Sequence, residues 1–212
     1  MLDNISDKAA EILINIGSVN FSPDKPYKLT SGKYSPVYCD CRRIISFPNE
    51  RKELMDFAIA KISERGLLKK ITNISGGETA GIPFSSFIAS ELNLPMTYIR
   101  KQKKEFGRKE QIEGIMDQSD KVILVEDLLT DGGSKLDFIR AIENKGAQVS
   151  AIFVIFNYGI FGNYFSYNEK KIDLVYLTKW ENILKVAKIK KKISDKDITK
   201  IWSFLNDLGV KN

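Results

Sequence analysis

The sequence predicts an α/β fold in which a parallel β-sheet is covered by helices on both faces. Short apolar runs typical of buried strands alternate with longer stretches of helical periodicity from about residue 70 to residue 180. Strands separated by helices are typically parallel and lie between two helical layers. With 212 residues, 43% of them hydrophobic, the chain is long enough and apolar enough for one domain with its own core.

The first third of the chain is expected to hold two helices and an irregular hairpin. Ser6 is a plausible N-cap for the first helix, and the second has Pro48 in its first turn and Gly66 at its end. The hairpin turn falls at residues 30–33. The expected spans are a helix over 6–17, a hairpin over 27–42 and a helix over 47–66 whose buried stripe comprises Leu54, Phe57, Ala58 and Ile62.

In the rest of the chain, predicted strands alternate with predicted helices. Ser194 and Asp197 have the spacing of a capping box at the start of the last helix. Strands are expected over 71–75, 96–100, 121–127, 148–156 and 171–177. Helices are expected within 77–93, 134–147, 180–189 and 194–209.

The cysteines and the absence of histidine limit the chemistry. Cys39 and Cys41 have strand spacing that would put both on one face, and with no histidine in the chain they predict packed, reduced thiols rather than a zinc site. No side chain titrates near pH 7 unless its environment shifts it. Catalysis must therefore use carboxylates, lysines, a metal or fixed charge.

The net charge of +6 is concentrated in one segment. Residues 100–109 hold six basic side chains and one acid, a local charge of +5. A polyphosphate accounts for such a cluster as well as DNA does, and a solvated loop is the alternative without a ligand. The basic run at 188–192 lies between two helices and is interpreted as a solvated link.

Three polar loops follow three successive predicted strands: residues 75–81, 100–107 and 126–134. In parallel sheets ligands bind at the carboxyl ends of the strands, so these loops are expected to meet at one site. In the third loop, Glu126 and Asp127 can accept hydrogen bonds from sugar hydroxyls or face a hydrated metal. Residues 130–134 can form a phosphate-binding nest at the start of a helix. The pattern predicts a ribose 5-phosphate site, and its alternative is a capped helix without a ligand.

The segment "VILVEDLLTDGGSK" resembles the phosphoribosyl pyrophosphate (PRPP) signature of the type I phosphoribosyltransferases. Together with "FSPDKPYKLTSGKYSPVYCDCR", "GGETAGIP" and "MTYIRKQKKEFGRKEQIEG", in this order, it is similar to the orotate phosphoribosyltransferase family from about Phe21 to Phe156. The resemblance implies a type I phosphoribosyltransferase-like sheet with a small N-terminal hood. It also implies conversion of orotate and PRPP to orotidine 5′-monophosphate and pyrophosphate with Mg²⁺ in UMP synthesis, and a homodimer whose basic loop enters the neighbour's site.

The resemblance also assigns roles. Glu126 and Asp127 would hold the ribose hydroxyls, and Lys104 would be the loop lysine most important for catalysis, with Mg²⁺ held mainly through PRPP and water rather than by assigned protein ligands. Orotate would contact Thr130, Lys33 and Tyr38. PRPP would contact Arg100, Lys101, Lys104, Glu126, Asp127, Leu128, Leu129, Thr130, Asp131, Gly132, Gly133 and Ser134.

The chain departs from the family pattern at several positions. Phe106 stands where the basic loop often has histidine, and Thr30 where a lysine is frequent. Asn157 and Tyr158 occupy the region of an Asp-Arg pair that helps to hold the base. Lys33, Tyr38 or backbone amides near residues 35–36 are therefore expected to compensate for the arginine.

One domain is expected over residues 1–212, with a core at about 46–178 and a hood formed mainly by residues 1–45, with the C-terminus as a further candidate part. No apolar stretch approaches the roughly 20 residues of a membrane span, and the N-terminus lacks signal-peptide features. A cytoplasmic enzyme without nucleic-acid or membrane partners is expected. Two alternatives are a type I phosphoribosyltransferase for another base and a non-catalytic, PRPP-sensing regulator.

Overall fold

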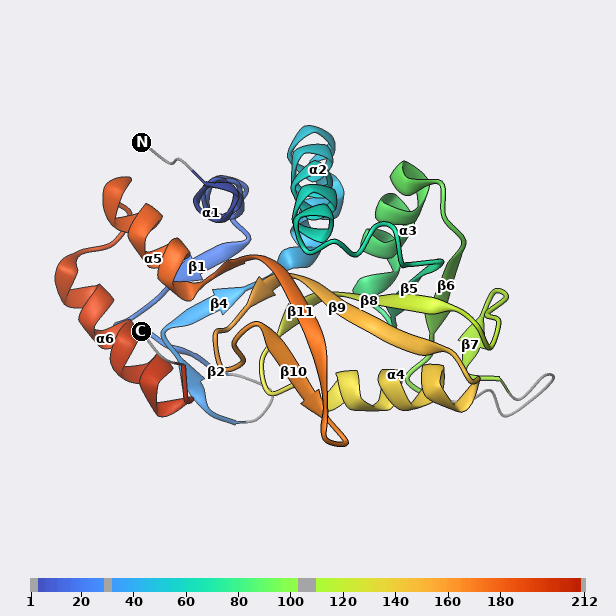
Figure 1. Cartoon of the computed structure of the whole chain (residues 1–212). Helices are drawn as coiled ribbons and strands as arrows, with labels where there is room; N and C mark the ends of the chain where they lie inside the picture. The colour runs from blue at the N-terminus through green and yellow to red at the C-terminus, as the bar shows by residue number, and fades with distance from the viewer. Residues whose placement is uncertain (1–3, 29–31, 103–109, 211–212) are drawn as a thin grey trace.

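A seven-stranded sheet forms the centre of the molecule in a computed structural model that describes residues 4–28, 32–102 and 110–210 (Figure 1). Its strand order is β10-β11-β9-β8-β5-β6-β7. The five inner strands are parallel, as predicted, and both edge strands are antiparallel to their neighbours. The strands are β5 (Asn73–Gly77), β6 (Met96–Ile99), β7 (Ile112–Glu113), β8 (Lys121–Leu129), β9 (Gln148–Asn157), β10 (Tyr164–Tyr167) and β11 (Lys170–Lys179).

Helices cover both faces of this sheet. In Figure 1, α1 (Ile5–Asn15), α2 (Pro48–Glu64) and α3 (Gly81–Leu92) lie on one side, and α4 (Gly133–Asn144) lies on the other. Strand β9 shows why two cores form: Phe153 belongs to the cluster under α1, α2 and α3, whereas Ile152 belongs to the cluster under α4. Because successive side chains point to opposite faces, a strand buried on both sides must be apolar almost throughout.

The N-terminal hairpin is confirmed in part. Strand β2 (Tyr27–Lys28) pairs with β3 (Tyr34–Ser35), but β4 (Val37–Cys39) pairs with β1 (Val19–Phe21), a strand that was not predicted. Thr30 lies outside the described residues.

The placement of both cysteines on one strand is wrong, because Cys41 already belongs to the 3-10 helix η1 (Cys41–Ser46). The two thiols are nevertheless neighbours, with their Sγ atoms 3.7 Å apart. Both are buried and free, as expected for packed thiols.

Helix ends follow the sequence with one exception. Ser6 is not the first N-cap: the side chain of Asn4 accepts a hydrogen bond from the backbone of Asp7, so the helix begins before Ser6. Pro48 lies in the first turn of α2, and Ser194 forms the expected capping box with Asp197. The C-terminal helices are α5 (Trp180–Ile189) and α6 (Asp195–Asp207).

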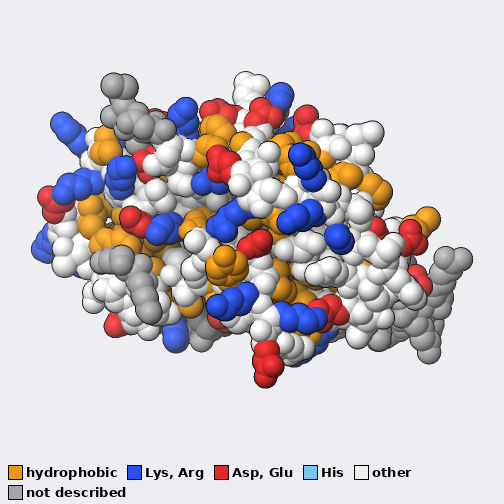
Figure 2. Space-filling view, in the orientation of Figure 1, with side chains coloured by type: hydrophobic (Ala, Val, Ile, Leu, Met, Phe, Trp, Pro, Cys, Tyr) orange, Lys and Arg blue, Asp and Glu red, His pale blue; other side chains and the backbone are white. Residues whose placement is uncertain are grey.

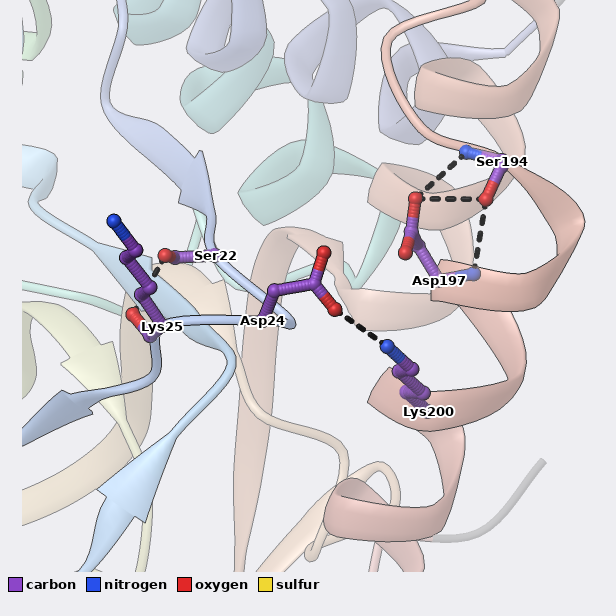
Figure 3. A network of polar contacts seen from close by, with 6 residues as sticks. All are labelled: Ser22, Asp24, Lys25, Ser194, Asp197 and Lys200. Carbon is purple, nitrogen blue, oxygen red and sulfur yellow. Dashed lines mark hydrogen bonds and ion pairs between the residues drawn. The ribbon is translucent and has the colours of Figure 1, made fainter.

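These C-terminal helices pack against the N-terminal part of the chain. The Nζ atom of Lys185 lies 2.5 Å from the buried carboxylate of Asp7. Burial disfavours the ionised form of Asp7, but hydrogen bonds from Lys185 and Asn182 outweigh this and lower its pKa. Figure 3 shows a second link, in which Lys200 of α6 contacts Asp24 at 2.6 Å. The two ends of the chain therefore form one structural unit beside the sheet.

The surface of the face drawn in Figure 2 carries Lys and Arg side chains interspersed with Asp and Glu, without a single large basic patch. Among the described helices, none is long and apolar enough to cross a membrane.

Candidate active site

The predicted acidic pair lies near the end of a central strand. Strand β8 continues two residues past Asp127, to Leu129, whose side chain is fully buried. The chain then turns into α4 through Gly132, which has a φ of +80°. A Cβ atom on Gly132 would lie 2.5 Å from the ring of Phe165, so both the backbone conformation and the available space require glycine.

A cavity of about 600 Å³ opens at the carboxyl ends of the inner strands. It draws residues from the loop after β5, the start of the basic segment after β6, and the β8–α4 connection, so the predicted meeting of three loops is confirmed. A cavity of this size suits a small ligand. Its lining comprises Arg42, Ile45, Glu78, Thr79, Ala80, Pro83, Lys101, Glu126, Asp127, Ser134 and Lys135.

The glycines at the end of β5 and at the start of α3 have a packing reason that the sequence did not reveal. A Cβ atom on Gly77 would lie 2.0 Å from Oε1 of Glu126, and one on Gly81 would lie 2.2 Å from the carbonyl oxygen of Val125. The missing side chains at Gly77 and Gly81 therefore leave room for strand β8 and for the carboxylate of Glu126. The Glu78–Thr79 peptide bond between these glycines is cis, and the Glu78 carboxylate accepts a 2.7 Å hydrogen bond from the backbone of Lys101.

Glu126 is the most perturbed acid of the cavity. It is only 5% exposed, and its Oε2 atom lies 3.6 Å from Nζ of Lys135. Burial raises the pKa of Glu126 to about 7; the charge of Lys135 opposes this shift, and the neighbouring Asp127 adds to it. A carboxyl group that titrates near neutral pH can change its charge when a ligand binds.

The turn that the sequence predicts to bind phosphate contains hydrogen bonds from its own side chains. Asp131 accepts a 3.2 Å hydrogen bond from the backbone N–H of Gly133, and Asp127 accepts one of 2.8 Å from the backbone of Leu128. In this structure the Gly133 amide is therefore already bonded to the Asp131 carboxylate.

Four of the predicted site residues line the cavity: Lys101, Glu126, Asp127 and Ser134. Others do not. The side chain of Arg100 lies 3.8 Å from Glu113, Lys33 is exposed, and the ring of Tyr38 lies 5.9 Å from that of Tyr27. Two positions, Lys104 and Phe106, lie outside the described residues.

Asn157 and Tyr158, which stand in the region of the family's Asp-Arg pair, have structural contacts. Asn157 accepts a hydrogen bond from the backbone of Gly159 and donates one to the carbonyl of Phe161. Tyr158 packs edge-on against Phe156 and Trp180, and burial raises its pKa. Neither side chain lines the cavity.

Sequence reasoning missed several residues of the lining, above all Arg42 and Lys135. Arg42 comes from η1, and its Nε atom donates to Asp40 at 2.7 Å. No local pattern distinguishes Arg42, because only the folding of the N-terminal segment against β8 brings it to the cavity. Lys135 directly follows the predicted phosphate turn and could have been found there.

Comparison with known proteins gives consistent matches. The family model of the phosphoribosyl transferase domain matches residues 48–197. Orotate phosphoribosyltransferase from Ruegeria sp. is 44% identical over 206 residues, which cover 97% of this chain and 91% of that protein. The enzyme of the same name from Rhizobium rhizogenes is 45% identical over 203 residues, or 95% of this chain and 88% of that protein. The crystal structure of orotate phosphoribosyltransferase from Aeropyrum pernix has the same fold, with a TM-score of 0.70 at 22% identity over 87% of this chain and 99% of that chain.

The pKa of Glu126 predicts a pH-dependent stability that Glu126→Gln removes. The folded protein binds a proton at Glu126 up to about pH 7, whereas the unfolded chain releases it near pH 4.5. The stabilisation is therefore fully present below pH 4.5 and is lost as the pH rises to about 7, a change of about 3 kcal/mol at about 1.4 kcal/mol per pKa unit. Urea unfolding of both proteins between pH 4.5 and 8 measures the difference.

An exposed glutamate on α2 provides the control for this experiment. Glu53→Gln should leave the pH dependence of the wild type unchanged. Parallel curves for the wild type and Glu126→Gln would show that the burial of Glu126 does not perturb its titration.

Proposed function

This chain belongs to the orotate phosphoribosyltransferase family, and we propose that it transfers the 5-phosphoribosyl group of PRPP to orotate. The products are orotidine 5′-monophosphate and pyrophosphate, in the synthesis of UMP. The observation that carries the proposal is the cavity in which two strand-end acids, Glu126 and Asp127, face the start of a helix at Ser134. The acids can accept hydrogen bonds from sugar hydroxyls, and the helix N-terminus can bind a phosphate. Together they suit a ribose 5-phosphate.

The PRPP contacts follow from this orientation. Glu126 and Asp127 accept hydrogen bonds from the ribose hydroxyls, and the backbone N–H groups of the turn bind the 5′-phosphate. Lys101 also lines the cavity, and its backbone N–H donates to Glu78; its side chain is proposed to bind the pyrophosphate. The proposed PRPP contacts are Arg100, Lys101, Lys104, Glu126, Asp127, Leu128, Leu129, Thr130, Asp131, Gly132, Gly133 and Ser134, with Leu129 restricted to backbone contacts by its burial.

The reaction needs charge stabilisation more than proton transfer. The bond from the anomeric carbon to pyrophosphate breaks, and its electron pair leaves with the pyrophosphate. A ring nitrogen of orotate forms the new bond to that carbon and releases its proton to solvent. Positive charge develops on the sugar, as in glycosyl hydrolysis, near the carboxylates of Glu126 and Asp127. Lys101, with Arg100 and Lys104, stabilises the leaving group without any histidine.

We propose that Mg²⁺ arrives with PRPP. Among the described residues, no group of three or more His, Cys, Asp or Glu side chains could hold a metal ion by itself. The cavity does offer the carboxylates of Glu126 and Asp127, and Mg²⁺ typically binds one or two carboxylates together with substrate phosphates and water. When bound, the ion would neutralise charge on the pyrophosphate and the ribose oxygens.

Orotate is proposed to lie against the hood, where Thr130, Lys33 and Tyr38 contact it. The hood would consist of residues 1–45 and the C-terminal helices, over a core at about 46–178, within one domain. The contacts of Asp7 with Lys185 and of Asp24 with Lys200 support the C-terminal contribution.

We propose a cytoplasmic location. The buried free thiols of Cys39 and Cys41, whose sulfur atoms lie 3.7 Å apart, fit a reducing compartment.

Turnover should require PRPP, Mg²⁺ and orotate together. Loss of orotate absorbance measures it, and uracil and hypoxanthine in place of orotate are the controls. Asp127→Asn removes a carboxylate at the ribose without removing a core side chain, so kcat/KM should fall at least roughly 100-fold while thermal unfolding changes little.

Each contrary result has a different meaning. Faster turnover with uracil or hypoxanthine would identify a phosphoribosyltransferase for another base. PRPP binding without pyrophosphate release from any acceptor would favour a regulator. Normal activity of Asp127→Asn with an unchanged KM for PRPP would refute the placement of the ribose.

Lys33→Ala should raise the KM for orotate more than the KM for PRPP. The orotate carboxylate is negatively charged, and this chain lacks the arginine that usually binds it in the family. Lys33 is expected to supply the missing positive charge. Lys28→Ala is the matched control, because Lys28 is also exposed and lies on the paired strand of the same hairpin. Steady-state kinetics with each substrate varied separately test this, and a larger effect on the KM for PRPP would contradict it.

We further propose a homodimer in which the basic loop of one subunit completes the site of the other. Lys104→Ala and Asp127→Asn homodimers should then both be nearly inactive. After mixing, unfolding and refolding, half of the dimers are heterodimers, and one site of each heterodimer carries neither change. About a quarter of wild-type activity should return, by the symmetry of a two-fold dimer.

A loop that serves its own subunit gives no recovery, since each heterodimer site then carries one lesion. Each variant refolded alone is the control. Activity near zero in a mixture that native mass spectrometry shows to contain heterodimers would refute the shared site.

A further inference from the structure

We propose that Lys135 is a further ligand-binding residue of this site, whose ammonium group pairs with Glu126 in the free protein and contacts the 5′-phosphate when a nucleotide or PRPP binds. This inference rests on the proposed function and assigns a subsite within it. Lys135 comes one residue after the turn that the sequence predicts to bind phosphate.

The position of Lys135 connects the two halves of the site. It is the third residue of α4, and it is only 7% exposed. Its Nζ atom lies 3.6 Å from Oε2 of Glu126 and 3.4 Å from Oγ of Ser134, and all three residues line the same cavity. The ammonium group is therefore within reach of both the proposed ribose acid and the proposed phosphate turn.

The hydrogen bonds of this ammonium group are incomplete. An ammonium group has three N–H donors, and among the described residues Lys135 makes one long hydrogen bond, to Ser134. The contact with Glu126 at 3.6 Å is an ion pair without hydrogen-bond geometry. A buried charge is stable only when it is well paired, and the loose contact with Glu126 leaves this ammonium group able to bind an anionic partner from the cavity that it lines.

The charges of the residues beside Lys135 also favour a phosphate ligand. Burial raises the pKa of Glu126 to about 7, so near neutral pH its carboxyl group supplies only part of a negative charge to Lys135. The next acid, Asp127, lines the same cavity, but among the described residues it forms no ion pair with Lys135. A phosphate group at Ser134 would supply the missing charge, and the N-terminus of α4 would favour the same position.

Two ligands that differ only in this phosphate provide the test. Orotidine 5′-monophosphate carries the 5′-phosphate, and orotidine lacks it. In the full-length protein, Lys135→Met should weaken binding of the nucleotide roughly 10- to 100-fold and leave binding of orotidine unchanged, as expected for a lost charge-assisted contact. Isothermal titration calorimetry of both ligands with both proteins forms a double cycle that isolates the contact with phosphate.

Controls separate a contact with phosphate from a structural role. Lys145→Met removes a half-exposed lysine at the other end of α4, where it pairs with Glu110, and should change neither affinity. If Lys135→Met does not fold, Lys135→Arg retains the charge, and it should keep the ratio of the two affinities within about threefold of the wild type by the same reasoning. If a folded Lys135→Arg variant no longer bound the nucleotide more tightly than orotidine by the wild-type ratio, a contact between the charge of Lys135 and the phosphate would be refuted.

The outcomes are distinct. Equal weakening of both ligands by Lys135→Met would make Lys135 a structural partner of Glu126 and would overturn the proposal, as would unchanged binding of both. A wild-type protein that binds neither ligand would overturn the proposed function itself, which the wild-type titrations reveal independently of any variant.

Discussion

The site depends on one constraint, the burial of the Glu126 carboxylate at the end of a central strand. A buried carboxylate needs room and a countercharge. Gly77 provides the room, since any Cβ atom there would lie 2.0 Å from Oε1 of Glu126, and Lys135 provides the countercharge at 3.6 Å. The glycine at the end of β5 and the position of Lys135 at the start of α4 can both be understood as consequences. The ion pair of Glu126 with Lys135 is long, and the pKa of Glu126 stays raised despite the charge of Lys135.

A second requirement is that distant parts of the chain meet beside this strand. Helix α5 begins at Trp180, which packs with Phe156 and Tyr158 at the end of β9. The same helix holds α1 through Asp7 and Lys185, and α6 contacts Asp24. The N-terminal segment is thereby fixed close to the sheet, and Arg42 of η1 reaches the cavity. The absence of the family's Asp-Arg pair is consistent with this packing, because Asn157 and Tyr158 hold the loop and the aromatic cluster.

The sequence predicted the inner sheet and its helices because both have strong periodicity. Strand β9 is apolar on both faces, and α6 begins with an unambiguous capping box at Ser194. Short edge strands such as β7 and β10 carry too few residues for a pattern. Glu126, Asp127 and Ser134 could be assigned to the site because they lie close together in a recognisable loop. Arg42 could not, since tertiary packing alone brings it there, and the role of Gly77 follows from a contact between two strands.

A crystal structure of the protein with orotidine 5′-monophosphate would show directly how the nucleotide lies in the cavity. We expect the 5′-phosphate at the turn before α4, within hydrogen-bond distance of the backbone N–H groups of residues 131–134. The ribose hydroxyls should then contact Glu126 and Asp127. A nucleotide bound with its phosphate beside Lys101 and its sugar away from both acids would contradict the assignment of the site.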